Sequence, residues 1–112
     1  MSEFVYAIDT EDVPAGRSMP ARIGDNWYAV CNDGGTFHVT DIECPHEGGP
    51  LGRGEVRDGC VICPVHHWPW DLGTGLSDTN LPHLRLKTYP CEVRDGKLYA
   101  DVSAPIPPDL TR

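Results

Sequence analysis

Two short segments of this chain combine cysteine and histidine at spacings that suit a metal site. The first contains Cys44 and His46, and after sixteen intervening residues the second contains Cys63 and His66. Thiolates are soft ligands and imidazoles are borderline ones, so zinc and iron–sulfur clusters are the candidate occupants. Each segment begins with Cys-Pro and brings a histidine within three residues, so each supplies one sulfur and one nitrogen ligand.

The distribution of the ligands between the segments bears on the choice of metal. A tetrahedral zinc ion with two Cys and two His ligands would only hold the loops together. Zinc fingers usually pair cysteine with cysteine and histidine with histidine, whereas each segment here carries one of each. This mixture favours a two-iron cluster in which one iron takes both thiolates and the other takes both imidazoles. Zinc stays open as the alternative on the residues alone.

Composition limits the partners and the cellular compartment that we expect for this chain. The chain has 112 residues, enough for one domain, and nine basic residues against 17 acidic ones give a net charge of −8. We expect no nucleic-acid partner, because no basic stripe neutralises phosphates, and no membrane segment, because no apolar run approaches roughly 18 residues. An odd number of cysteines, five, and an N-terminus unlike a signal peptide predict a cytoplasmic protein with metal-bound or reduced thiols.

The elements that position these segments are predicted to be short β-strands. Eleven prolines and 12 glycines interrupt every helical period, whereas alternation with a period of two is common. Asp58-Gly59 and Asp95-Gly96 favour the positive φ angles of tight hairpins. The chain is therefore expected to be all-β, an antiparallel sandwich or small barrel. The expected strands are 3–8, 17–22, 26–32, 36–42, 55–57, 60–62, 84–94 and 97–102.

Other cysteine, histidine and tryptophan residues have simpler interpretations. Cys60-x-x-Cys63 has the spacing of a thioredoxin-like motif, but Pro64 and the strand pattern oppose the helix that such a motif opens. Cys60 is therefore expected to be a small core residue. The same expectation holds for Cys31 and Cys91, and Trp27 is also expected in the core. His38 and His83 are expected to be strand or surface residues.

Both metal-binding segments resemble the Rieske motif, Cys-x-His followed by Cys-x-x-His. The resemblance extends over residues 3–102 and includes Leu51, Gly54, Trp68, Trp70, Asp71, Leu72, Thr74, Gly75, Leu81, Pro82, Tyr89, Pro90, Val93, Asp95, Gly96 and Val102. It implies one 2Fe-2S cluster, with Cys44 and Cys63 on the inner iron and His46 and His66 on the outer iron. It also implies a Rieske-like fold over residues 1–102, with three stacked antiparallel sheets and the two loops at the tip. Residues 103–112 would form a Pro-rich C-terminal tail.

The resemblance also indicates the class of Rieske protein. High-potential members carry a disulfide between the loops at the positions of Gly49 and Val65, and hydroxyl donors where this chain has Trp68 and Trp70. Without these features we expect a potential near the low end of the Rieske range, about −150 mV. His67 stands where the family usually has glycine. Because histidine tolerates positive φ better than most residues, we expect a strained but intact loop.

The function implied is that of a soluble one-electron carrier. The chain resembles the ferredoxin component of multicomponent aromatic-ring dioxygenases, whose partners are a flavin-dependent ferredoxin reductase and a terminal oxygenase. An electron-transfer subunit of another reductase or hydroxylase, such as a nitrite-reductase-like system, is the alternative. A complete oxygenase is excluded, because a second iron site would need a further domain and ligands beyond His38, His67 and His83. The protein is expected to do no bond chemistry itself.

Overall fold

The computed structural model describes residues 3–45, 48–65, 67–77 and 85–106. Almost all of its regular structure is β, and two single turns of 3-10 helix complete it. The elements run in the order β1 (Val5–Asp9), η1 (Thr10–Asp12), β2 (Arg17–Ile23), β3 (Asn26–Asp33), β4 (Thr36–Asp41), η2 (Leu51–Arg53), β5 (Glu55–Arg57), β6 (Cys60–Ile62), β7 (Pro69–Asp71), β8 (Thr88–Tyr89), β9 (Cys91–Arg94) and β10 (Lys97–Ala100).

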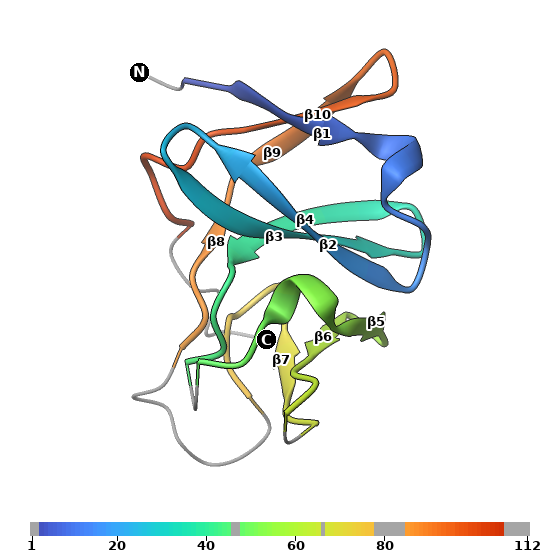
Figure 1. The fold of residues 1–112 in the computed structure, drawn as a ribbon, viewed down its shortest axis with the longest axis vertical. Coiled ribbons are helices and arrows are strands. Elements are labelled where there is room, and N and C mark those ends of the chain that lie inside the picture. The colour runs from blue at the N-terminus through green and yellow to red at the C-terminus, as the bar shows by residue number, and fades with distance from the viewer. Residues whose placement is uncertain (1–2, 46–47, 66, 78–84, 107–112) are drawn as a thin grey trace.

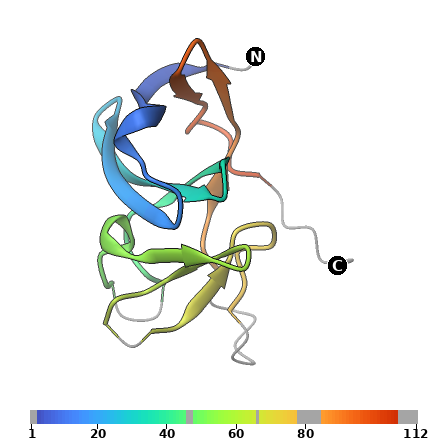
Figure 2. The ribbon, with the colours of Figure 1, turned by 90° about the vertical axis from the view of Figure 1, so that its right-hand side faces the viewer.

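The strands form two hydrogen-bonded antiparallel sheets. The smaller has the order β1-β10-β9, and the larger has the order β7-β6-β5-β2-β3-β4-β8. Strands β2 and β5 are joined through a single register pair, Arg17 with Glu55, and Figure 1 shows β5, β6 and β7 as a separate lower tier beneath β2, β3 and β4. The three-tier arrangement implied by the resemblance is therefore present, and two of its tiers share one register pair of strand residues (Figures 1 and 2).

The expected all-β antiparallel architecture is confirmed, with two differences in detail. The segment expected as one strand over 84–94 is divided at Pro90 into β8 in the larger sheet and β9 in the smaller one. Proline has no amide hydrogen for a ladder, so the chain changes sheets there. Strand β7 was not expected, because three residues that begin with Pro69 show no readable alternation.

Both Asp-Gly turns adopt the backbone that the sequence predicts. Asp58 and Gly59 have φ angles of 54° and 75°, and Asp95 and Gly96 have φ angles of 52° and 75°. Positive φ at both central residues is the requirement of a type I′ hairpin turn, whose twist matches that of the flanking strands. These turns connect β5 with β6 and β9 with β10. The Asp58-Gly59 turn therefore fixes the register of the hairpin that leads into the second cysteine segment.

Two hydrophobic cores separate the three tiers. The upper core is built from aliphatic residues and Tyr89, and it lies between the small sheet and β2, β3 and β4; its buried members are Ala7, Val13, Ala21, Ile23, Val30, Val39, Tyr89, Leu98 and Ala100. The lower core includes three cysteines and a tryptophan; its buried members are Ala29, Cys31, Cys44, Leu51, Val56, Val61, Cys63, Trp70, Leu72 and Leu86. Two of the predicted metal ligands thus belong to the lower core.

The expectation for Trp27 was wrong. Its side chain is 53% exposed, near the start of β3, where the strand is not yet covered. Cys31 is fully buried as expected, whereas Cys60 and Cys91 are only partly buried. The aromatic residue type alone did not reveal that the first residues of β3 lie outside the core.

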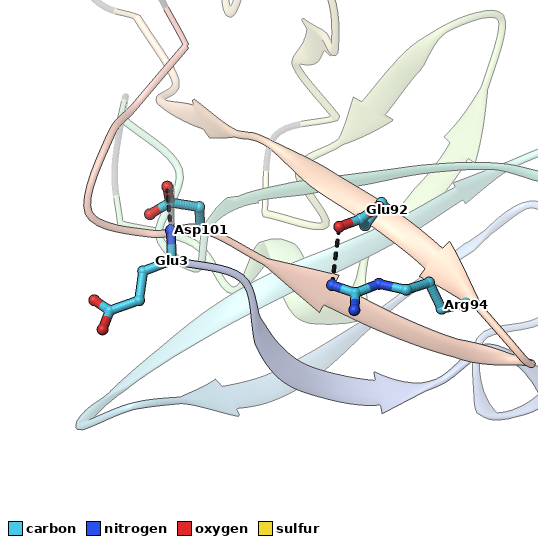
Figure 3. A network of polar contacts seen from close by, with 4 residues as sticks. All are labelled: Glu3, Glu92, Arg94 and Asp101. Carbon is cyan, nitrogen blue, oxygen red and sulfur yellow. Dashed lines mark hydrogen bonds and ion pairs between the residues drawn. The ribbon is translucent and has the colours of Figure 1, made fainter. Parts of the chain in front are cut away.

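The N- and C-terminal parts of the domain meet at the small sheet. The Glu3 amide donates to an Asp101 carboxylate oxygen at 3.1 Å, and Arg94 forms an ion pair with Glu92 at 2.9 Å (Figure 3). Hydrogen bonds from Ser103 and Glu3 lower the pKa of Asp101. Further along the predicted tail, the Ile106 amide donates to the Thr88 carbonyl at 2.7 Å. The domain boundary after residue 102 stays a prediction.

The described residues include no helix with the length and apolar character that crossing a bilayer requires.

Candidate metal centre

The first cysteine segment leaves β4 and folds back on itself at Cys44. The Cys44 amide donates to the Gly49 carbonyl at 2.8 Å, and the Gly48 amide donates to the Cys44 carbonyl at 2.7 Å. Gly48 has a φ of 72°, a left-handed conformation that glycine adopts without steric cost. The segment is closed by the Leu51 amide, which donates to the Ile42 carbonyl at 2.9 Å. These bonds hold Cys44 in place with its side chain only 2% exposed.

The second cysteine segment follows β6 and repeats this hydrogen-bond arrangement. The Cys63 amide donates to the Trp68 carbonyl at 3.0 Å, five residues on, and the His67 amide donates to the Cys63 carbonyl at 2.8 Å. His67 has a φ of 59° and takes the place of Gly48 in the first loop. The expectation of a positive φ at His67 is therefore confirmed. Cys63 is 2% exposed, like Cys44.

The two loops are packed directly against each other. A Cβ atom built on Gly49 would lie 2.6 Å from Cys63 Sγ and 2.8 Å from Val65 Cγ2. Gly49 and Val65 are the two positions at which high-potential Rieske proteins are expected to carry a disulfide. The positions are adjacent here, and neither residue can form that bond. Any side chain at Gly49 would occupy the space beside the Cys63 sulfur.

A tight turn follows β7, the strand that comes directly after the second loop. The Asp71 Oδ1 atom accepts hydrogen bonds from the Gly73 and Thr74 amides at 2.7 and 2.9 Å, and Thr74 Oγ1 accepts from the Leu76 amide at 3.1 Å. Gly75 has a φ of 76°, and a Cβ there would approach the Leu86 carbonyl oxygen to 2.1 Å. The Asp-Leu-x-Thr-Gly sequence is therefore explained by this turn: Asp71 and Thr74 accept its amide hydrogen bonds, and Gly75 lets the chain pass close to Leu86.

The structure brings together the sulfur ligands that the sequence predicts. Cys44 and Cys63 lie in the same buried core, each directly inside its own loop. His46 and His66 lie outside the described residues, so their assignment as ligands stays a prediction. Within the described residues alone, no three Cys, His, Asp or Glu side chains gather around a common metal position. All five cysteines are described, and none is in a disulfide.

The surroundings of the two thiols combine exposed loop residues with a buried floor. Pro64, Val65 and His67 are exposed on the second loop, and Val65 is 47% exposed. Trp70 forms part of the floor and is fully buried, with its ring centroid 6.2 Å from that of Trp68. Cys31, a third buried thiol of this core, lies on β3, and burial raises its pKa to about 12.

Comparisons with known proteins agree with this geometry. Residues 3–90 match the model of the Rieske [2Fe-2S] domain. The ferredoxin subunit of methanesulfonate monooxygenase from Methylosulfonomonas methylovora is 33% identical, over 89% of this chain and 81% of its own length. The ferredoxin subunit of 3-phenylpropionate/cinnamic acid dioxygenase from Shigella flexneri is 30% identical, over 88% of this chain and 92% of its own length.

Other curated relatives are much longer than the region they share with this chain. The match covers 44% of a human Rieske domain-containing protein and 20% of 4beta-methylsterol monooxygenase from Methylococcus capsulatus, both at 33% identity and over 58% of this chain. The chain thus spans less than half the length of these two relatives. Rieske domains therefore occur both in ferredoxin subunits and within larger oxygenases.

Solved structures show the same fold. The ferredoxin of Sphingomonas yanoikuyae B1 superposes with a TM-score of 0.77 at 26% identity, covering 88% of this chain and 98% of that one. A protein assigned as the small subunit of an NADH-dependent nitrite reductase from Mycobacterium tuberculosis gives a TM-score of 0.80 at 21% identity, over 93% of this chain and 98% of its own. The second similarity concerns the fold alone.

The donors in the described residues fit a two-iron cluster of this kind. Two buried thiols from two abutting loops can supply the paired sulfur ligands of one iron. Gly49 leaves room beside the Cys63 sulfur that any larger residue would fill. With the family model matched from residue 3 to residue 90 and the thiols placed in this way, the chain belongs to the Rieske [2Fe-2S] domain family, whose members hold one 2Fe-2S cluster.

Proposed function

We propose that this chain is a soluble one-electron carrier that accepts electrons from a flavin-dependent ferredoxin reductase and delivers them to a terminal oxygenase. The observation that carries this proposal is the burial of Cys44 and Cys63 directly inside exposed loop residues such as Val65. A cluster on these thiols would be shielded from water and still lie near a surface where an electron can leave. The two ferredoxin subunits of oxygenase systems among the relatives support the choice of partners.

The proposed ligands are Cys44 and Cys63 for the inner iron and His46 and His66 for the outer iron. The cluster supplies storage for one electron, and the chain supplies the ligands, the burial and the docking surface. The carrier itself makes or breaks no bond in a substrate. Two ferric ions, two sulfides and two thiolates sum to zero charge, and neutral imidazoles add none. One added electron therefore gives the cluster a charge of −1 in the lower core.

Substitution of the two neighbouring histidines of the second loop tests this ligand set. His66→Cys is expected to change the electron paramagnetic resonance spectrum of the reduced protein, because a thiolate would alter the ligand field of the outer iron. His67→Cys is the matched control, one residue away, and is expected to leave the spectrum of the cluster unchanged. An unchanged spectrum in His66→Cys would remove His66 from the ligand set.

The carrier is expected to have a low potential for its class. Gly49 and Val65 abut without a disulfide, and the net charge of −8 disfavours an additional electron. A redox titration should give a midpoint toward the low end of the Rieske range, about −150 mV. A midpoint above about +100 mV would contradict the assignment to the low-potential class.

Transfer between purified components tests the function as a whole. Holoprotein should contain two irons and two acid-labile sulfides per chain, and should be reduced by NADH only when a flavin-dependent ferredoxin reductase is present. The reduced protein should then reoxidise when an oxygenase component with its substrate is added. A protein that holds the cluster and exchanges electrons with neither component would contradict the carrier role. A protein with one zinc and no sulfide would instead support the alternative of a zinc site that only holds the loops together, in a domain that serves as an interaction module.

The alternative partner, a nitrite-reductase-like system, has only the similarity of fold in its favour. The ferredoxin subunits are more similar in sequence, at 30% and 33% identity. We also propose a cytoplasmic location, supported by the five cysteines outside any disulfide. Fractionation of the native host would test it, and recovery of the protein from an oxidising compartment would contradict it.

A further inference from the structure

Trp70 presents a buried hydrogen-bond donor that the protein itself does not use. The side chain is 0% exposed, and its Nε1–H has no hydrogen-bond partner in the structure. The indole N–H group is a donor only, so its partner must be a hydrogen-bond acceptor. Buried polar groups in folded proteins nearly always have a partner. This N–H group therefore indicates an acceptor that is not part of the polypeptide.

The strand register places Trp70 beside one of the two loop thiols. In the β6–β7 hairpin, Trp70 is directly opposite Val61, and the bond from the Cys63 amide to the Trp68 carbonyl extends the same pairing. Alternate residues of a strand share a face, so Val61, Cys63 and Trp70 lie on one side of the hairpin. Cys63 and Trp70 are then diagonal neighbours, a separation that an aromatic side chain can bridge.

Burial agrees with this placement. Val61, Cys63 and Trp70 are all at most 2% exposed, and they pack in the same core as Cys44. The indole therefore shares the lower core with both proposed ligands of the inner iron. The acceptors expected there are the bridging sulfides of the cluster, because the sulfurs of Cys44 and Cys63 are present in the structure and the Nε1–H group has no partner in it.

We propose that Trp70 Nε1–H donates a hydrogen bond to one of these sulfurs and thereby raises the midpoint potential of the cluster. The added electron makes the sulfurs more negative, so the hydrogen bond is stronger in the reduced state than in the oxidised state. Trp70 would act through this hydrogen bond alone and would not be a ligand of either iron. Tryptophan at this position thus retains a hydrogen-bond donor, although it lacks the hydroxyl group that high-potential relatives are expected to carry there.

A second possible acceptor lies near Trp70 and must be distinguished experimentally from the sulfurs. Ser77 is the antiparallel bridge partner of Trp70, and Ser77 Oγ is likewise buried without a hydrogen-bond partner. A water molecule between Nε1 and Oγ would satisfy both groups without involving the cluster. Ser77→Ala distinguishes the two arrangements, because it removes the water's second partner and leaves the indole in place.

The test measures the midpoint potential of holoprotein variants. Trp70→Phe is expected to lower the ratio of reduced to oxidised cluster about tenfold at a fixed solution potential, which for a one-electron couple is a downward shift of ~59 mV. Replacement of Trp70 by β-(benzothiophen-3-yl)alanine keeps the ring shape, lacks the N–H group and should give the same shift. Trp27→Phe is the matched control for an exposed tryptophan and should give no shift, as should Ser77→Ala.

Vibrational spectra of the unmodified protein give a second readout. Transfer into D₂O should shift the Fe–S stretching bands, and part of that shift should be missing in the benzothiophene variant. An unchanged potential in the benzothiophene variant, or a shift reproduced by Ser77→Ala, would overturn the proposal. The inference rests on the cluster and not on the partners. Absence of iron and sulfide would therefore defeat the proposed function, whereas a full cluster with an unchanged potential would defeat only this inference.

Discussion

The two cysteine loops have the same backbone hydrogen bonds, but they differ in the residue that adopts positive φ. That residue determines the conformational cost of forming the loop. In each loop the cysteine amide donates to the carbonyl five residues on, and the amide four residues on donates back to the cysteine carbonyl. The residue that makes this return bond has positive φ in both loops, at 72° for Gly48 and 59° for His67. Glycine accepts that conformation freely, whereas histidine is strained in it.

This difference indicates that the site requires the backbone hydrogen bonds around each cysteine, whereas it tolerates different residues at the position with positive φ. The backbone frame around each thiol is repeated, so it is the feature that places a sulfur beneath each loop. The residue at the left-handed position is not repeated, so the second loop carries a conformational cost that the first avoids.

Removal of either loop thiol should have the largest effect. Cys44→Ala and Cys63→Ala should each lose most of the bound iron and sulfide, because the inner iron would retain only one sulfur ligand from the chain. Cys31→Ala is the matched control, since Cys31 is buried in the same core and lies outside both loops. It should keep two irons per chain. Comparable iron contents in all three variants would show that the loop thiols are not special.

The contact between the loops is tested by Gly49→Ala. The new methyl group would lie 2.6 Å from Cys63 Sγ, and overpacking of this kind typically costs about 1–3 kcal/mol. We expect loss of cluster as well as lower stability, measured by iron content and chemical denaturation. Gly52→Ala is the control, because its methyl group would meet Ile42 and Pro20 at 3.0–3.1 Å and no thiol. It should be destabilised with its iron content intact.

Exchange of the residues at the left-handed position should give effects of opposite sign. Gly48→Ala is expected to lower the free energy of unfolding by about 1 kcal/mol, the steric cost of a Cβ in that conformation. His67→Gly should raise it by a few tenths of a kcal/mol, since the relief is partly offset by the greater freedom of glycine in the unfolded chain. Asp95→Gly, with a φ of 52° in the hairpin of the small sheet, shows the same relief away from the loops. Destabilisation by His67→Gly would mean that the imidazole makes a compensating contact.

The smallest effect concerns the buried thiol outside the loops. Burial raises the pKa of Cys31 to about 12 from 9.0, so the folded state holds this proton more tightly than the unfolded state. The stability due to this group is fully present below about pH 8, begins to fall as the unfolded thiol ionises near pH 9, and is lost as the pH rises toward 12. Between pH 8 and pH 9 the loss should be about 0.4 kcal/mol. Urea unfolding of Cys31→Ala should show a dependence on pH that is weaker by this amount.

The sequence predicted the chemistry of the site more completely than its geometry. The spacing around Cys44 and Cys63 was sufficient to nominate two thiols that the structure places in one core. The repeated hydrogen-bond frame had no such signal, because it joins backbone atoms of residues that differ between the loops. The exposure of Trp27 and the existence of β7 were missed for a related reason. Both depend on which neighbouring segments cover a short stretch of chain, and that is a tertiary property.

The single register pair between Arg17 and Glu55 has a consequence for how this domain can vary among proteins. Ser18 reinforces the junction, since its hydroxyl bonds to the carbonyls of Leu51 and Gly54 and accepts from the Gly54 amide. Beyond this junction, the described parts of the two cysteine loops and strands β5, β6 and β7 share no ladder with β2, β3 and β4. Insertions in their turns would therefore leave the pairing of the remaining scaffold undisturbed, so one frame can carry loops of different shape in different members of the family.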